Sequence, residues 1–299
     1  MAIADNDYFS AQTNSDCTTK SITINSAADF VKYASCPDLQ TLIVGPAAGP
    51  EIDITGPKRI LGDLILRNNS LLNTLKSSSL ASIAGKFNLN DVTALSTLQF
   101  DVLTSVKSID WAGLPFLISL TLPQTISTAD SVVITNTNIE SLDGINLKKV
   151  GLLDINNNGR LKKFDTQVAN ISQGVNIAGN SKSLIVSFPN LLWANNMTFR
   201  DVQGLTTPSL ATVNGSLIFV NNGFSEYVAP NLTSVGNVGT SQGSFAFVGN
   251  NKLNNISFPA ITSIGGAFQV ANNSALQEIT MKALERVGGA IDLSGNFTT

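Results

Sequence analysis

The chain has 299 residues, of which 43% are hydrophobic and only 13% are charged, and its formal net charge is −3. No basic face is evident, which argues against a nucleic-acid partner, and the absence of histidine removes the most common general base and metal ligand. No apolar run approaches the roughly eighteen residues of a membrane span. We find no motif for a metal or a cofactor and expect neither.

The N-terminal region predicts a flexible segment followed by a short strand and a short helix. Residues 1–16 lack the charged-then-apolar pattern of a signal peptide, and we expect them to be flexible. Ser21–Asn25 alternates like a strand. Ser26–Ser35 predicts a short helix, with the leading serine as its N-cap and an aspartate three residues later.

Two cysteines, Cys17 and Cys36, flank this strand and helix. A disulfide between them would close a loop of about twenty residues and contribute about 3 kcal/mol to stability. Two unrelated buried thiols are the alternative. We favour the disulfide because both cysteines flank one compact element, and we expect residues 17–36 to cap the N-terminal end of the domain.

The rest of the chain repeats a unit that is most clearly seen in Phe258–Asn273. Each unit holds an apolar marker, an apolar residue three positions earlier, and an alternating apolar pair typical of a strand with one face inward. Asparagine often follows, where its side chain can bond the backbone at a corner, and stacked corners of this kind predict an internal asparagine ladder. The expected ladder residues are Asn69, Asn158, Asn180, Asn222, Asn273 and Asn296. Successive markers are 19 to 29 residues apart, and they are Ile60, Ile83, Val106, Ala129, Val150, Ile171, Ala194, Val213, Val235, Ile264 and Val287.

No ten-residue helical period lies between the strand-like pieces, so the repeats predict an all-β solenoid with little helix beyond residue 36. A single repeat cannot bury its own apolar side, and stability must come from stacking on its neighbours. We therefore expect one domain over residues 17–299, made of about eleven rungs of 21 to 24 residues.

The order Cys17, strand, helix, Cys36, followed by repeats such as SVKSIDWAGLPFLISLTLP and SIGGAFQVANNSALQEITM, resembles the receptor L domain. That resemblance implies a right-handed parallel β-helix. Over residues 17–299 the chain is more closely similar to fungal GPI-anchored cell-wall organisation glycoproteins. This similarity implies an extracellular, N-glycosylated protein of the cell wall or the outer face of the plasma membrane. A membrane would be contacted only through a lipid anchor, whose signal this chain does not carry.

We accordingly expect a non-enzymatic surface glycoprotein that contributes to fungal cell-wall organisation and integrity. Wall polysaccharide, or wall and membrane proteins, would be its partners. The alternative is a receptor-type module that binds a glycan or a protein on its sheet face. A polysaccharide-active enzyme is a third hypothesis. The outward position between each inward pair predicts a column along the sheet, made of Ile65, Asn88, Asp110, Val133, Asp154, Asn176, Thr198, Ile218, Gln269 and Asp292. Asp110 and Asp154 fall two rungs, or about 10 Å, apart in this column, but Val133 separates them and no third acid is evident.

Eight N-x-Ser/Thr sequons are present, a number that asparagine-rich composition alone largely accounts for. Asn68, Asn272 and Asn296 lie at or beside the corners, where the side chain could be buried. The expected glycan carriers fall before strand pairs or at loop starts, and they are Asn170, Asn214, Asn231 and Asn255, with Asn196 as a further candidate.

The longest spacing between markers contains a glycine-rich insertion, Gly236–Gly243. A loop that projects from the flank of a solenoid is a candidate recognition element, and a flexible excursion is the alternative. The candidate recognition residues are Gly236, Asn237, Thr240, Ser241 and Gln242.

Overall fold

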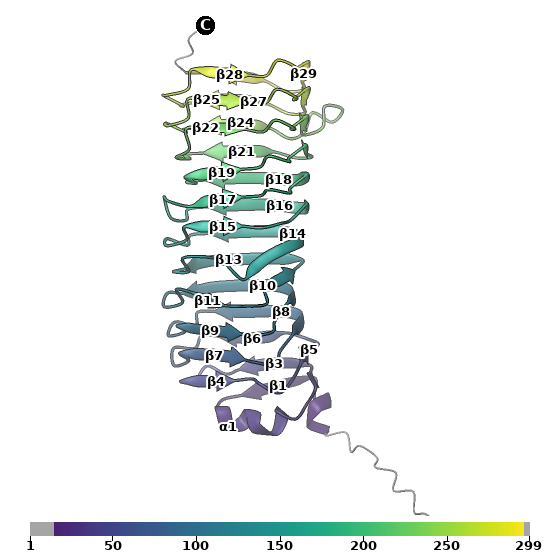
Figure 1. Ribbon diagram of the computed structural model, residues 1–299, viewed down its shortest axis with the longest axis vertical. Helices are drawn as coiled ribbons and strands as arrows, with labels where there is room; N and C mark the ends of the chain where they lie inside the picture. Colours follow the sequence, from purple (N-terminus) through teal and green to yellow (C-terminus); the bar gives the residue numbers. More distant parts are fainter. Residues whose placement is uncertain (1–14, 296–299) are drawn as a thin grey trace, which may run out of the picture.

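The computed structural model describes residues 15–295, which form a single column of stacked rungs (Figure 1). The predicted parallel β-solenoid is confirmed, with about 12 turns of about 22 residues. The expected count of about eleven rungs agrees with this, and a further rung at Leu39 precedes the first marker, Ile60, with which it pairs. Residues 1–14, most of the segment predicted to be flexible, and Asn296 lie outside the described residues.

The short helix predicted over Ser26–Ser35 is present in the cap, divided into an α-helical turn and a 3-10 turn. A 3-10 turn spans Ser15–Thr18, helix α1 spans Ala27–Phe30 and a second 3-10 turn spans Val31–Tyr33. The Ser26 hydroxyl accepts a hydrogen bond from the Asp29 amide at 3.3 Å, so the predicted N-cap is confirmed. All later elements of the described chain are strands and turns.

One parallel sheet of 20 strands runs the length of the column. Each rung contributes a main strand, and these are β1 (Ser21–Ile24), β3 (Thr41–Val44), β6 (Leu64–Arg67), β8 (Ser82–Asn90), β10 (Ser105–Leu114), β13 (Ser131–Thr137), β14 (Ile145–Asn156), β16 (Asn170–Ala178), β18 (Trp193–Arg200), β21 (Leu217–Val220), β24 (Phe245–Val248), β27 (Phe268–Ala271) and β30 (Ile291–Leu293). Shorter strands of the same sheet precede some of them, and these are β2 (Asp38–Leu39), β5 (Arg59–Ile60), β12 (Ile126–Thr128), β20 (Thr212–Val213), β23 (Ser234–Val235), β26 (Ser263–Ile264) and β29 (Arg286–Val287).

The cap contributes a rung of its own, since β1 pairs with β3. Three smaller sheets form a second side of the column. The strands of these sheets are β4 (Glu51–Asp53), β7 (Thr74–Ser77), β9 (Thr97–Phe100) and β11 (Leu120–Thr121); β15 (Lys163–Asp165), β17 (Ile185–Ser187) and β19 (Gly204–Thr206); and β22 (Glu226–Val228), β25 (Asn255–Ser257) and β28 (Glu278–Thr280).

The alternating apolar pairs point inward as predicted. Phe87 and Leu89 of β8, for example, are fully buried and align with Ile109 and Trp111 of β10. Several units carry this pair one residue closer to the marker than others do. The strand pairing accommodates this difference through a shift in register between the marker and the pair, as between Val106 and Ser108 of β10.

Aromatic rings fill much of the interior. Phe199, Phe219 and Phe247 come from three successive main strands and stack with centroid distances of 5.8 and 4.7 Å. The Tyr227 ring lies 4.6 Å from Phe219. Trp111 is buried and meets Phe87 edge-on at 5.4 Å. The core is therefore continuous from rung to rung.

A left-handed corner ends most main strands, from β6 to β27. The corner residue has a φ near +50 to +70°, a region that only glycine, asparagine and aspartate visit readily. The ten corner residues are Asn68, Asp91, Gly113, Asn136, Asn157, Gly179, Asp201, Asn221, Gly249 and Asn272. Each is of one of those three types, and five of the ten are asparagines.

The residue after each corner turns into the core, and six of these residues are asparagines. They are Asn69, Asn158, Asn180, Asn222, Asn250 and Asn273. The Asn158 side chain donates to Asn180 Oδ1 at 3.0 Å, and the Asn250 side chain donates to Asn273 Oδ1 at 3.1 Å. The predicted internal asparagine ladder is thus confirmed, and Asn250 is a member that the sequence analysis missed.

Candidate functional site

The outward residues of the main strands form a column, as the sequence predicts. Strand pairing aligns Ile65, Asn88, Asp110, Val133, Asp154, Asn176, Thr198, Ile218, Ala246, Gln269 and Asp292. Ala246 was absent from the predicted column because the glycine-rich insertion displaces its unit in the sequence. The column brings Asp110 and Asp154 to one face, with Val133 between them.

Both aspartates are bonded to amides of the same face. Asn88 Nδ2 donates to the Asp110 carboxylate at 3.0 Å. Asn156 and Asn176 each donate to Asp154 Oδ1 at 2.8 Å. Side-chain bonds between rungs therefore hold each carboxylate in its own local network. This arrangement suits a polar recognition face better than a pair of acids that share one substrate.

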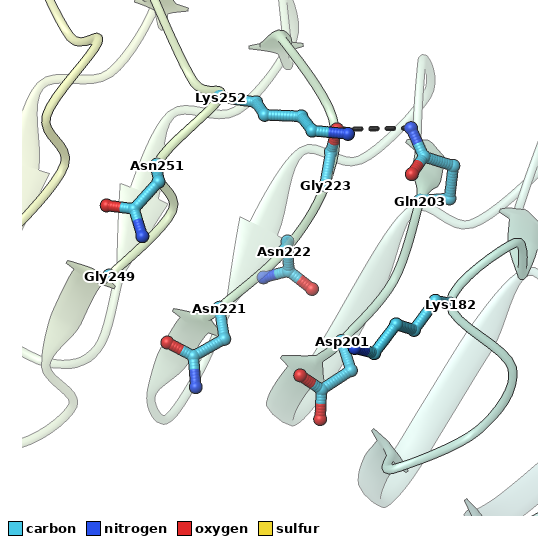
Figure 2. A pocket seen from close by; sticks show the side chains of 9 residues that line it. All are labelled: Lys182, Asp201, Gln203, Asn221, Asn222, Gly223, Gly249, Asn251 and Lys252. Carbon is cyan, nitrogen blue, oxygen red and sulfur yellow. Dashed lines mark hydrogen bonds between the residues drawn. The ribbon is translucent and has the colours of Figure 1, made fainter.

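A hollow lies on the corner side of the C-terminal half (Figure 2). It has a volume of about 320 Å³ and is lined by Lys182, Asp201, Gln203, Asn221, Asn222, Gly223, Gly249, Asn251 and Lys252. A second hollow of about 380 Å³ is lined by Asn251, Asn272, Asn273, Ser274, Ser294 and Gly295. The two share Asn251, and we call them together the corner groove.

Unequal corner lengths create this groove. Only Asn222 and Gly223 separate the corner residue Asn221 from the inward Phe224, and glycine adds no side chain there. The following corner is one residue longer and carries Lys252, whose side chain extends toward Gly223 in Figure 2. Gln203 Nε2 donates to the Gly223 carbonyl at 3.1 Å and forms the opposite wall (Figure 2). No sequence motif marked these residues.

The glycine-rich insertion forms a small closed loop that projects from the flank near β24 (Figure 1). The Asn237 amide donates to the Gln242 carbonyl at 2.8 Å, and the Gln242 amide donates back at 3.1 Å. The Asn237 side chain accepts from the Gly239 amide at 2.9 Å, and Ser241 adopts a positive φ of 52°. Recognition by Gly236, Thr240 and the other loop residues stays a prediction.

Four of the five favoured sequon asparagines are exposed, namely Asn170, Asn196, Asn214 and Asn231. Asn255 is only half-exposed, and its Oδ1 atom is buried without a hydrogen-bond partner in the described chain. Asn68 and Asn272 are also exposed, contrary to the expectation of burial. The expectation was wrong because the residue after each left-handed corner, not the corner residue itself, points inward.

We predict that at least two sequons carry N-glycans when the protein is secreted by a eukaryotic host. Exposed side chains such as Asn170 and Asn214 accept a glycan without disturbing the core, whereas Asn255 should show the lowest occupancy. Mass spectrometry before and after endoglycosidase treatment measures both quantities. An unchanged mass would refute glycosylation, and full occupancy at Asn255 would refute the ranking.

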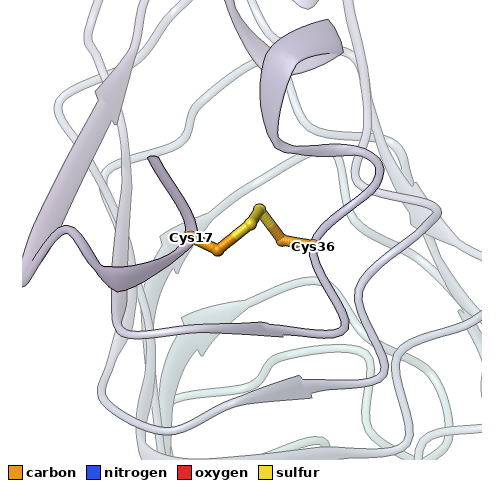
Figure 3. The surroundings of a disulfide bond; sticks show 2 residues. All are labelled: Cys17 and Cys36. Atoms are coloured by element: carbon orange, nitrogen blue, oxygen red, sulfur yellow. A yellow bond between two sulfur atoms is a disulfide. The ribbon is translucent and has the colours of Figure 1, made fainter. Parts of the chain in front are cut away.

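The cap is held by the Cys17–Cys36 disulfide (Figure 3). The two Cα atoms are 5.4 Å apart, and the described chain holds no free cysteine. This confirms the favoured pairing over two separate thiols. Cys36 is fully buried in the first rungs, so the bridge ties the N-terminal 3-10 turn to the core.

Replacing Cys17 and Cys36 together with alanine should lower the free energy of unfolding by about 3 kcal/mol, because the closed loop spans about twenty residues. Denaturant unfolding of the two proteins measures this loss. Reductant should destabilise the wild type toward the variant and leave the variant unchanged. Equal stability of variant and wild type would show that the bridge is not needed to hold the cap.

Several ionisable groups have shifted pKa values, and each shift has a structural cause. The Arg59 guanidinium donates to Asp38 at 2.7 and 2.6 Å and lowers the pKa of that carboxyl. The Asn25 amide lowers the pKa of Asp29 at the helix start. Burial raises the pKa of Tyr227, whose hydroxyl lies 2.7 Å from that of Thr207. None of these groups lines the corner groove.

Residues 15–295 hold no cluster of three or more potential metal-binding side chains. Within the same range no helix is both long and apolar enough to cross a membrane. The molecule is thus a disulfide-capped parallel β-solenoid, an architecture consistent with the receptor L domain.

Comparison with known proteins supplies the family. No family model matches the chain, and no solved structure is significantly similar to it. The chain is 38% identical over 251 residues to protein ecm33 of Aspergillus fumigatus, an alignment that covers 83% of this chain and 61% of the relative. It is 37% identical over 247 residues to a cell surface GPI-anchored protein of Arthroderma benhamiae, covering 82% and 62%.

A third relative, the cell wall mannoprotein PST1 of Saccharomyces cerevisiae, is 33% identical over 230 residues, which are 76% of this chain and 49% of that protein. The chain belongs to this family of fungal cell-wall and GPI-anchored cell-surface proteins. It spans about half to three-fifths of the length of these relatives.

Proposed function

We propose that the protein is a non-enzymatic component of the fungal cell surface, in the wall or at the outer face of the plasma membrane. There it contributes to the organisation and integrity of the wall. The observation that carries this proposal is the similarity over 83% of the chain to a fungal relative whose family includes cell-wall and GPI-anchored proteins.

The fold supports a structural role. Main-strand side chains that face inward are almost all buried and apolar, so each rung is devoted to stacking on the next. Twelve or so rungs at about 4.8 Å give a rod close to 60 Å long. Such a rod holds its surface groups at fixed spacings, which suits the display or joining of other wall components.

The surface chemistry supports a partner rather than a reaction. The outward aspartates are engaged by amides, and the corner groove is lined mainly by amide, hydroxyl and ammonium groups. Wall polysaccharides, or proteins of the wall and membrane, are the proposed partners. Hydrogen bonds to hydroxyl groups are the interactions that this surface is equipped to make.

Cell fractionation tests the location. The complete gene product, tagged outside the solenoid, is produced in a fungal host, and intact cells are treated with an impermeant protease. We expect the tagged protein in the wall and surface fractions and lost after protease treatment, while a cytosolic marker stays protected. Recovery of the protein only inside protease-resistant cells would contradict the proposal.

A further inference from the structure

We infer that the corner groove binds an extended, hydroxyl-rich glycan chain that lies along the axis of the solenoid. The inference rests on the proposed function, because a protein of the cell surface would meet such a glycan in the wall. The chemistry of the groove itself stands on the contacts described below.

The groove has the length and repeat of a polymer site. Its lining comes from six successive rungs, beginning at Lys182 and ending at Ser294. At about 4.8 Å per rung the lined path is about 24 Å long. Each step from one rung to the next is comparable with one sugar residue of an extended chain. A repeating ligand can therefore meet at least one polar side chain at every step.

Its amides retain hydrogen-bonding capacity. Asn221 and Asn251 are exposed on adjacent corners. No side-chain hydrogen bond within residues 15–295 involves Asn221, and Asn251 uses only its oxygen, which accepts from Ser274 at 3.3 Å. A primary amide carries two donors and an acceptor, and a sugar hydroxyl both donates and accepts. The two amides are therefore matched to hydroxyl groups on neighbouring sugars.

The groove carries too little net charge to select a polyanion over a neutral glycan. Lys182 and Lys252 are exposed, and neither belongs to a salt bridge of the described chain, so both ammonium groups can donate to hydroxyl oxygens. Asp201 offers an acceptor in the same groove and offsets one of the two positive charges, which leaves a net charge of +1 along the whole lining. The lining residues contain no aromatic ring on which a sugar could stack. We therefore expect hydrogen bonds alone to set the affinity, with a dissociation constant of about 1 mM.

Two variants that alter the groove and one control variant test the inference. N221G combined with N251A removes both amides, and glycine keeps the left-handed backbone of the first position. G223L fills the floor. A side chain there meets only the flexible end of Gln203, 2.6 Å from the new Cβ, and the backbone φ at Gly223 is not positive. N136G combined with T93A is the matched control, because it removes an exposed corner asparagine and an exposed hydroxyl away from the groove.

Binding is measured by saturation-transfer NMR with four oligosaccharide probes: laminarihexaose, mannohexaose, chitohexaose and an acidic oligogalacturonate. The protein is treated with endoglycosidase. All proteins compared carry N272G, because Asn272 lines the groove and begins a sequon, and glycine keeps its left-handed backbone. We expect a neutral hexaose to bind the wild type and the N136G/T93A control equally. Binding to N221G/N251A and to G223L should be weaker by about tenfold, the effect of losing hydrogen bonds of this kind.

The inference is overturned if no neutral hexaose binds, if only the acidic probe binds, or if the groove variants bind like the wild type. Circular dichroism and thermal unfolding show that each variant is folded before it is tested. Because the assay uses purified protein, a negative result would leave surface location, measured by fractionation, unaffected. Conversely, an intracellular location would refute the proposed function without changing the measured affinity.

Discussion

Replacing Phe219 with alanine should lower the free energy of unfolding by about 3 to 5 kcal/mol, the usual cost of removing a buried phenylalanine. Phe219 is fully buried and touches rings from the rungs on both sides. Its centroid lies 5.8 Å from that of Phe199, 4.7 Å from Phe247 and 4.6 Å from Tyr227. The cavity left by alanine would remove contacts on three sides at once, and the stacked rungs could not collapse to fill it.

Denaturant unfolding measures the loss of stability, and amide hydrogen exchange shows which strands are affected. Because each rung contacts only its neighbours, protection of backbone amides from exchange should decrease mainly in β18, β21 and β24. Phe116→Ala is the matched control, since Phe116 is 65% exposed and its loss should change stability by no more than about 0.5 kcal/mol. Equal effects of the two substitutions would contradict the described packing.

Replacing Asn250 with alanine should cost about 3 kcal/mol or more, although it removes only a small polar group. Its Oδ1 accepts from the Asn222 backbone amide at 2.9 Å and from the Asn222 side chain at 3.0 Å. Its Nδ2 donates to the Phe219 carbonyl at 3.2 Å and to Asn273 Oδ1 at 3.1 Å. All these groups are buried, and alanine would leave several of them without a partner, at about 1 to 3 kcal/mol each.

Asn251→Ala provides the comparison for this prediction, because the neighbouring side chain is exposed. Its loss should be nearly neutral in denaturant unfolding, while Asn250→Ala shifts the transition markedly. If both variants unfolded like the wild type, the internal asparagine ladder would not contribute to stability. The pair of variants thus separates buried from exposed asparagines one residue apart.

Much of the fold could be predicted because the repeat expresses packing directly. Inward pairs such as Phe268 and Val270 alternate in the sequence for the same reason that they alternate in the strand. The cap was also predictable, since Ser26 and the two cysteines carry local signals. The rung at Leu39 was missed because it lies close to the cap and lacks a full unit before it.

Other features depend on geometry that single residues do not reveal. Asn250 and Ala246 were missed because the Gly236–Gly243 insertion separates them from their marker, although the structure restores both to their columns. The exposure of Asn68 follows from its positive φ, which its residue type permits but does not impose. The corner groove depends on unequal corner lengths in adjacent rungs, so its lining residues are neighbours only after folding.

The role in the wall is tested most directly by a chimera. This chain replaces the aligned 251-residue stretch of protein ecm33 in an Aspergillus fumigatus strain that lacks its own copy, so that the relative supplies its remaining segments. Growth is then scored on a dye that binds wall polysaccharide. The proposed function predicts that the chimera restores growth to the level given by the intact relative. The proposed function would be contradicted if the chimera reached the surface in the same amount as the intact relative, yet growth stayed at the level of the strain that lacks ecm33.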